Sequence, residues 1–540
     1  MTIKLASLGV KKLTFACSLG GLRALLIMCL LVFADLPVAV AQVNPQLPAG
    51  FPVTLDNYIE KAVRDWEVPG LAIAIVRNDS VLVAKGYGVR ELGKPEHVDG
   101  NTVFNIASLT KSFTAAAAAM LVDEGKLAWD APARRYLPGL EFNDPSLTAQ
   151  VTMRDLLSHR TGLQPANMMW VLSGISRAEI LRRAKFLKPD RPFRTEEIYS
   201  NVGYTIAGEA IAAAAGTSYE DVIRQRIFAP LGMRSTTIGN DDVPRISNRV
   251  SPHAIIGGVQ RSFPWRNNEA TMPAGGINST ASDMATWLRF QMSDGAFAGK
   301  RLISAPQMWE MRSPQTIIPV TPGMKKGRQV EGWPAYGLGW NIMDYRGHPM
   351  IWHSGNGPGQ PVLMTIFPAD HLAILVMMNT WAAGVLHGMI TNKIADTYLG
   401  FPPRDWSGEM LPRKPEIRGE SAKRLADMQK LRNPMAPASH DLAAYSGTYS
   451  DSLFGDQTVR LTEGGLTLQM GGPKGEIADL TQLNYDTFLA MWRDPVFRED
   501  YPALLTFAAD SEGAIAQLTI HINRDHIVSS RVTADKTVRH

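Results

Sequence analysis

The chain has 540 residues, of which 45% are hydrophobic and 20% charged, and its formal net charge at pH 7 is +4. This composition excludes disordered and fibrous proteins and predicts a globular protein with more than one domain. Lys4, Lys11, Lys12, Arg23 and Asp35 together contribute +3 of the charge and leave about +1 for the rest, which argues against nucleic acid or an anionic membrane as partner.

The N-terminal segment has the layout of a signal peptide. Its basic start is followed by the apolar stretch "ALLIMCLLVF" and by "AVAQ", a small-x-small cleavage site, so we expect residues 1–41 to be removed and the protein to be periplasmic or secreted. The alternative is an uncleaved membrane anchor, but the apolar stretch is short and Asp35 and Pro37 interrupt it, so we expect no stable membrane span afterwards. Both cysteines, Cys17 and Cys29, lie in this segment, which leaves no thiol for a nucleophile, a disulfide or a metal site.

Residues 42–400 read as one α+β domain. The phrase "TLDNYIEKAVRDWEVPG" has helical spacing, and "LAIAIVRNDSVLVAKGYG" predicts two strands joined by an Asn-Asp turn. A buried alanine-rich helix follows within residues 104–130, helical patterns dominate residues 151–231, and two strands, "VLMTIFP" and "LAILVMMN", precede a helix over 385–399. Strands at both ends with helices between them indicate that the first and last strands come together in a sheet.

The remainder of the chain has a different character. Residues 401–438 carry repeated prolines and alternating charge without a sustained period, and we interpret them as a linker. Residues 439–540 contain short alternating segments broken by Gly-Gly and Asp-Ser-Glu-Gly turns. This pattern predicts a small antiparallel β domain, a sandwich or a barrel.

The helix within residues 104–130 begins beside Ser108, three residues before Lys111. On a helix such residues are neighbours, roughly 5–6 Å apart. A buried amine loses its proton readily and can accept the proton of the serine, while unpaired N–H groups at the helix start can hold an oxyanion. Alone the spacing is weak, because Ser-x-x-Lys arises by chance about once or twice in a chain of this length.

Tyr199 and Asn201 stand two residues apart, just before another helical stretch. A tyrosine near a cationic lysine favours its phenolate form and can pass a proton to a leaving group, and an asparagine amide can hold a substrate carbonyl. The alternatives are an aromatic side chain packed on the core and a helix cap.

A third motif is "IWHSGNGPG", with His353, Ser354, Gly355 and Asn356. Its glycines allow another backbone to approach, the strand edge can pair with an extended substrate, and the N–H of Asn356 can complete an oxyanion hole. The alternative is a glycine turn into a strand, with a solvated or core histidine.

Ser-x-x-Lys, Tyr-x-Asn and His-x-Gly in this order resemble the motifs of the serine β-lactamase and penicillin-binding-protein superfamily, in its class C-like branch of D-aminopeptidases, D,D-carboxypeptidases and esterases. Phrases such as "VPGLAIAIV", "VTMRDLLSHRTGL", "PAGGINSTASDMATWLRF" and "YGLGW" extend the resemblance over residues 54–400. It implies an antiparallel sheet flanked by a helical subdomain. It also implies a lipocalin-like C-terminal domain, which can shape access to the site or assist assembly.

The resemblance also implies roles for residues. Ser108 is then the acylating nucleophile, Lys111 its proton acceptor and Tyr199 the shared general base and acid, with His353 as a further catalytic residue. Substrate-binding residues are Asn201, Ser354, Gly355 and Asn356. The last motif departs from Lys-Thr-Gly of the lactamases, and a neutral histidine holds a substrate carboxylate less well, which leaves peptide amides and esters as substrates.

We therefore expect an exported serine hydrolase that forms an acyl-enzyme, with a peptidase ranked above a carboxylesterase and that above a β-lactamase. Linear or D-amino-acid-containing peptides, such as linearised microcystin, are candidate substrates, and the loops at 164–172 and 316–333 are expected to flank the site. A penicillin-binding or cell-wall-peptide sensor without turnover is the alternative of another class. We expect no cofactor and no metal, since His348 and His353 form only a loose pair and Trp352 breaks a Gly-x-Ser-x-Gly elbow. The sequence does not decide whether the protein is a monomer or a homo-oligomer.

Overall fold

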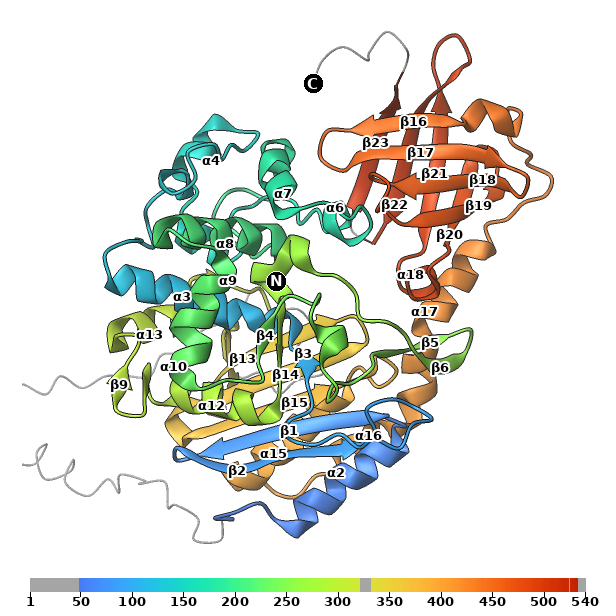
Figure 1. Cartoon of the computed structure of the whole chain (residues 1–540). Helices are drawn as coiled ribbons and strands as arrows, with labels where there is room; N and C mark the ends of the chain where they lie inside the picture. The colour runs from blue at the N-terminus through green and yellow to red at the C-terminus, as the bar shows by residue number, and fades with distance from the viewer. Residues whose placement is uncertain (1–47, 321–331, 524, 533–540) are drawn as a thin grey trace, which may run out of the picture. The chain divides into compact units, whose positions relative to one another are not determined.

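A computed structural model of the chain describes residues 48–320, 332–523 and 525–532 (Figure 1). The expected signal peptide and residues 321–331 of an expected site loop lie outside this range. None of the helices in the described ranges is long and apolar enough to cross a membrane.

The first domain is built on an eight-stranded sheet in which all neighbouring pairs are antiparallel. The first and last strands meet as expected, because Leu71 of β1 lies opposite Met378 of β15. Asn78 and Asp79 both have positive φ, as a two-residue type I′ hairpin between β1 and β2 requires. In sheet order the strands are β10 (Thr316–Ile317), β11 (Ala335–Tyr336), β12 (Asn341–Tyr345), β13 (His348–Gly357), β14 (Gln360–Phe367), β15 (Leu372–Met378), β1 (Gly70–Arg77) and β2 (Ser80–Gly88).

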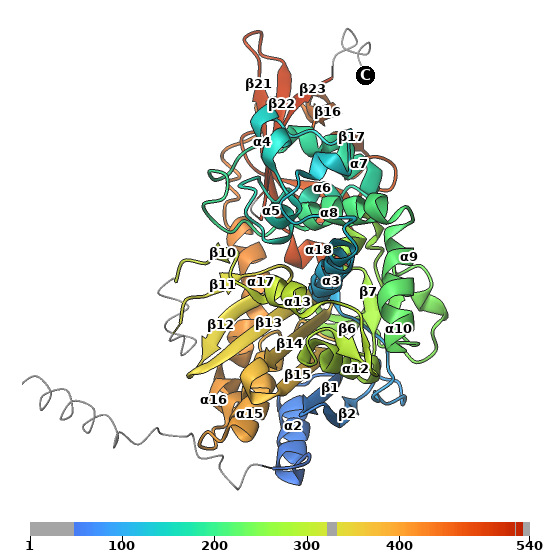
Figure 2. The same cartoon turned by 90° about the vertical axis from the view of Figure 1, so that its left-hand side faces the viewer.

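Helices cover both faces of this sheet (Figures 1 and 2). Leu71, Ile73 and Ile75 of β1 pack with α2 (Val53–Asp65) and α15 (Leu386–Leu399), whereas Ala72 and Ala74 face the core that contains α3. This alternation explains why β1 reads as a continuous apolar run: both of its faces are buried.

The helical part of the domain lies between β2 and β10. Its central helix α3 is buried at every position from 110 to 121, since small alanine side chains allow close packing all round. The helices are α3 (Thr110–Asp123), α4 (Pro145–Gln150), α5 (Met153–Leu157), α6 (Met168–Val171), α7 (Arg177–Arg183), α8 (Asn201–Ala215), α9 (Tyr219–Ile223), α10 (Ala229–Leu231), α11 (Met272–Gly275), α12 (Ala281–Met292) and α13 (Ala305–Arg312). Short strands add β3 (Phe104–Asn105), β4 (Thr237–Ile238), β5 (His253–Ile256), β6 (Val259–Ser262), β7 (Ile277–Ser279), β8 (Ala296–Phe297) and β9 (Lys300–Arg301).

The stretch interpreted as a linker contains two helices, α16 (Trp406–Met410) and α17 (Lys414–Gln429). No residue of α17 is buried. Pairs such as Arg413 with Glu416 and Lys423 with Asp427, three or four residues apart, stabilise it instead. A helix without an apolar face leaves no periodic signal, and for this reason the sequence did not predict it.

The C-terminal strands close into an eight-stranded antiparallel barrel, since β16 pairs with both β17 and β23. The expected α+β domain followed by a small β-barrel is thus confirmed. Leu466, Leu468 and Met470 of β18 are buried while the residues between them are not, which is the alternation of a filled barrel. The elements are β16 (Gly447–Asp451), β17 (Gly455–Thr462), β18 (Gly465–Met470), β19 (Ile477–Asn484), β20 (Thr487–Trp492), α18 (Pro495–Asp500), β21 (Ala503–Ala509), β22 (Ile515–Ile522) and β23 (Asp525–Arg531).

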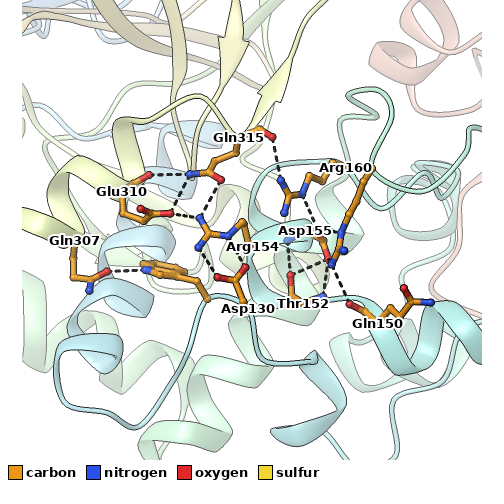
Figure 3. Close-up of polar contacts among 11 residues, drawn as sticks. Asp130, Gln150, Thr152, Arg154, Asp155, Arg160, Gln307, Glu310 and Gln315 are labelled. Atoms are coloured by element: carbon orange, nitrogen blue, oxygen red, sulfur yellow. Dashed lines mark hydrogen bonds and ion pairs between the residues drawn. The ribbon is translucent and has the colours of Figure 1, made fainter.

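A buried carboxylate ties α5 to the segment that precedes α8 (Figure 3). Asp155 accepts hydrogen bonds from the Thr152 backbone and hydroxyl, from Arg160 at 2.6 Å and from both Nε and Nη2 of Arg194. Burial raises the pKa of Asp155, but these donors outweigh it and the pKa lies below its ordinary value. The adjacent Arg154 joins Asp130 to Glu310 and Gln315.

Replacement of Asp155 by alanine should therefore destabilise the fold. The change leaves two guanidinium groups without their shared partner, and we expect the free energy of unfolding to fall by about 3 kcal/mol, as measured by urea denaturation. Asp242→Ala is the control, because the pair of Asp242 with Arg245 is exposed and its loss should cost less than about 1 kcal/mol. Equal losses in the two variants would contradict the structural role of Asp155.

Candidate active site

Ser108 lies in a single 3-10 turn, Ala107–Leu109, between β3 and α3. Ala107 has a φ of +44°, a left-handed conformation that non-glycine residues seldom adopt. The Asn105 side chain stabilises the turn by accepting a hydrogen bond from the Ala107 N–H at 3.1 Å. Such local strain is typical of functional sites, and here it places Ser108 at the start of a buried helix.

β13 approaches this turn so closely that only glycine fits. A Cβ atom on Gly355 would lie 2.6 Å from the carbonyl oxygen of Ile106, and one on Gly357 would lie 2.4 Å from Asn105 Oδ1. β12 pairs with β13 only as far as Trp352, so residues 353–357 form a strand edge that is not paired with β12. An extended substrate can pair with such an edge.

Lys111 is completely buried. Its Nζ lies 3.0 Å from Ser108 Oγ, 2.8 Å from Asn201 Oδ1 and 2.9 Å from the carbonyl oxygen of Ala274. Burial lowers the pKa of Lys111 well below its ordinary value. The two carbonyl oxygens can only accept, so a neutral amine donates both its N–H groups to them and keeps its lone pair for the Ser108 hydroxyl.

Tyr199 lies beside Lys111. Its ring centroid is 4.7 Å from Lys111 Nζ, and its phenol is close enough to Ser108 for that side chain to affect its pKa. Burial raises the pKa of Tyr199 far above its ordinary value, and the interaction with Ser108 offsets this only in part. The structure therefore does not favour the phenolate expected from the sequence, because burial of the phenol outweighs the interaction with Ser108 that lowers its pKa.

His353 is buried, and both of its ring nitrogens are occupied. Nδ1 lies 2.6 Å from the carbonyl oxygen of Ser354, which can only accept, so Nδ1 carries the proton. Nε2 then accepts from the hydroxyl of Tyr336 at 3.0 Å. Burial, followed by the charge of Lys111, lowers the pKa of His353 to about 3. The ring is neutral at pH 7, and neither nitrogen is left for a substrate.

Two site residues were not singled out from the sequence. His159 has a φ of +59°, and its Nδ1 accepts the N–H of Ser200 at 3.0 Å, which places its ring 4.3 Å from the ring of Tyr199. Tyr336 reaches the site only through the sheet, as the partner of His353. His159 lies in the phrase "VTMRDLLSHRTGL" and Tyr336 opens "YGLGW", both of which belong to the resemblance, but neither phrase indicated a role for the residue.

The residues predicted to bind substrate have different neighbours in the structure. Asn201 opens α8 and its Nδ2 lies 3.4 Å from Asn167 Oδ1, so the expected loop at 164–172 does reach the site. Next to Asn167, the N–H of Met168 donates to Asp525 of the barrel at 2.8 Å. The side chain of Asn356 is turned to another partner, because its Oδ1 accepts from Trp381 Nε1. Ser354 and Gly355 follow His353 on β13, opposite Leu363 and Val362 of β14.

The family model for β-lactamase matches residues 55–397, more than half of the chain. The chain belongs to this family of hydrolases. The resemblance inferred from the three motifs is thereby confirmed. Residues 431–534, which contain all the strands of the barrel, match a domain of unknown function.

Three relatives illustrate the range of the family. An unguisins hydrolase from Aspergillus violaceofuscus is 27% identical over 81% of this chain and 80% of its own length. The D-amino acid amidase from Ochrobactrum anthropi SV3, solved with L-phenylalanine amide, is 27% identical with a TM-score of 0.53 over 64% of this chain and 98% of its own. The octameric penicillin-binding protein homologue from Pyrococcus abyssi shares the fold at 20% identity, with a TM-score of 0.56 over 88% of this chain and 99% of its own.

The lowered pKa of Lys111 predicts the pH dependence of acylation of Ser108. A protonated amine cannot accept the serine proton, so kcat/KM should fall as pH decreases through a pKa below the ordinary lysine value of about 10.4. A pH profile measured with p-nitrophenyl acetate tests this. A rate that keeps rising with pH up to about 10 would mean that the amine titrates like a solvent-exposed lysine.

Gly355→Ala should reduce acylation strongly, because the new methyl group meets the backbone of Ile106 and shifts the turn that carries Ser108. A misplacement of about 1 Å can cost on the order of 100-fold in rate. Labelling by a fluorophosphonate measures the effect, and circular dichroism checks the fold. Gly388→Ala in α15 is the control, since a Cβ there meets no atom within 4 Å. Wild-type labelling of Gly355→Ala would contradict the prediction.

Proposed function

We propose that this protein is an exported serine hydrolase that cleaves amide bonds of peptides or amino-acid amides through an acyl-enzyme on Ser108. The contact of a fully buried Lys111 amine with Ser108 Oγ carries the proposal. A neutral amine whose N–H groups are held by two carbonyl oxygens directs its lone pair at the one hydroxyl beside it.

In the first step Ser108 Oγ attacks the carbonyl carbon of the substrate while its proton passes to Lys111 Nζ. The negative charge on the carbonyl oxygen is stabilised by N–H groups at the start of α3 and by the N–H of Asn356. Tyr199 then donates its phenol proton to the leaving nitrogen and takes a proton from the Lys111 ammonium in return. The C–N bond breaks, the amine leaves, and the acyl group stays on Ser108.

In the second step a water molecule attacks the acyl carbon and loses its proton to the Lys111 and Tyr199 pair. The Ser108 ester bond breaks, Ser108 regains a proton, and a carboxylic acid is released. His353 is an orienting residue in this scheme, because its ring holds Tyr336 and its own neighbouring carbonyl. His159 orients Tyr199 through the backbone of Ser200.

The substrate class follows from charge and from the relatives. A neutral His353 offers no cation to a substrate carboxylate, which disfavours β-lactams and carboxyl-terminal peptides. The names of an unguisins hydrolase and a D-amino acid amidase among the relatives favour amides, and peptides with D-residues, such as linearised microcystin, belong to this class. We rank a carboxylesterase and then a β-lactamase below this reading.

The proposal also covers the location of the protein, its oligomeric state and the role of the barrel. The signal-peptide pattern of residues 1–41 supports a periplasmic or secreted location. The octameric homologue supports a homo-oligomer. We propose that the barrel, which we compare with lipocalin-like domains, shapes access to the site, since Asp525 holds the start of α6 beside Asn167.

The test is a panel of D- and L-aminoacyl amides, linear peptides, p-nitrophenyl acetate and nitrocefin. We expect amide hydrolysis by the wild type and a loss of at least about 1,000-fold in Ser108→Ala and Lys111→Ala, since both remove the acylating pair. Gly388→Ala serves as the active control. Full activity in a folded Ser108→Ala protein would falsify the proposal, and stable labelling by penicillin without any turnover would favour a sensor.

A further inference from the structure

α6 (Met168–Val171) is a single helical turn, too short to be stable by itself. It belongs to the loop at 164–172 that reaches the site, and it lies against the barrel (Figure 1). Its position is therefore set by the contacts that hold its two ends.

The barrel holds both ends of α6. At the start, the carboxylate of Asp525 in β23 accepts the N–H of Met168 at 2.8 Å. Just past the end, the carbonyl oxygen of Leu172 accepts the N–H of Glu476, the residue before β19, at 2.8 Å. Two parts of the barrel thus fix a helix that belongs to the hydrolase domain.

Asn167 precedes α6 as its cap residue, but its side chain makes no capping hydrogen bond. An asparagine at this position ordinarily accepts an N–H of the first helical turn. Here Asp525 accepts one of these N–H groups instead, and a negative charge at the start of a helix is favourable. The side chain of Asn167 therefore reaches Asn201, whose Nδ2 lies 3.4 Å from Asn167 Oδ1.

This contact bears on the proton acceptor, because the amide of Asn201 has two possible orientations. In the observed one its Oδ1 accepts an N–H of Lys111 at 2.8 Å, which leaves the lone pair of the neutral amine for Ser108. In the flipped one Nδ2 would donate to that lone pair and compete with the serine hydroxyl. An acceptor beside Nδ2 favours the observed orientation, and Asn167 Oδ1 is such an acceptor.

We propose that Asp525 of the barrel is a positioning residue of the active site, which acts through Asn167 on the orientation of the Asn201 amide. The proposal rests on the proposed hydrolysis at Ser108 and adds a role for the barrel in acylation itself. Without Asp525 the N–H of Met168 loses its acceptor, and the side chain of Asn167 turns to cap α6. Asn201 Nδ2 then has no acceptor, and its amide no longer keeps one orientation.

The experiment is a double-mutant cycle on kcat/KM for p-nitrophenyl acetate, with active protein counted by complete labelling with a fluorophosphonate. Asp525→Ala and Asn167→Ala should each reduce kcat/KM about 3- to 10-fold, the effect of losing one hydrogen bond. The double variant should lose no more than either single variant, because both changes remove the same contact. Asp525→Asn keeps an accepting oxygen and should retain most of the activity. Asp479→Ala is the control, since Asp479 is an exposed barrel residue paired with Arg493, and its loss should leave kcat/KM unchanged.

A second pair of variants tests the other end of α6 without removing a charge. In Gly471→Ala the new Cβ would lie 2.6 Å from the Cβ of Ser173, so the end of α6 should shift. Gly513→Ala is the matched control, because both glycines have positive φ but a Cβ on Gly513 meets no atom within 4 Å. Hydrogen exchange of residues 166–174, measured by mass spectrometry, should be faster in Asp525→Ala and Gly471→Ala than in the two controls.

The outcomes separate this inference from the proposed function. Losses that multiply in the double variant overturn the inference, as do wild-type hydrolysis and wild-type exchange in Asp525→Ala, while Ser108-dependent ester hydrolysis still supports the serine hydrolase. Ester hydrolysis that persists in Ser108→Ala contradicts the proposed function instead. Hydrogen exchange needs no substrate, so it still tests whether the barrel holds α6 in that case.

Discussion

Burial of the Lys111 amine costs free energy, because an ammonium group loses its hydration when it leaves water. The groups that surround Lys111 offset this cost. The helix that carries Lys111 is surrounded by packed side chains, and the carbonyl oxygens of Asn201 and Ala274 accept the N–H groups of the neutral amine. The large apolar core of the domain stabilises the fold enough to offset the cost of keeping the Lys111 amine away from water. Reactivity at Ser108 thus depends on stability supplied elsewhere.

The same physical rule extends from Lys111 to its neighbours. Burial favours the neutral forms of Tyr199, His353 and His159, so the groups around Ser108 form a set of uncharged donors and acceptors rather than ion pairs. Hydrogen bonds inside such a region are strong because water does not compete for them. Proton transfer between neutral partners also needs little reorganisation of the surroundings.

Three segments far apart in the sequence make this site, and tight steric and polar constraints hold them together. Gly355 brings β13 against the turn before Ser108, because any side chain there would meet the Ile106 backbone. Asp155 connects α5 to Arg194, five residues before Tyr199. Lys111 joins the first segment to the second through Asn201, so a displacement of either neighbouring segment reaches the serine.

The sequence by itself determined the elements with strong periodicity and the chemistry of near neighbours. The buried helix α3, the hairpin of β1 and β2, the alternating strands of the barrel and the spacing of Ser108 and Lys111 depend on residues close in the chain, and they could be predicted. Only the tertiary structure decided the raised pKa of Tyr199, the pairing of His353 with Tyr336 and the contact of His159 with the backbone of Ser200. Periodicity shows which face of an element is apolar, whereas the state of a titratable group is set by whatever distant segment packs on it.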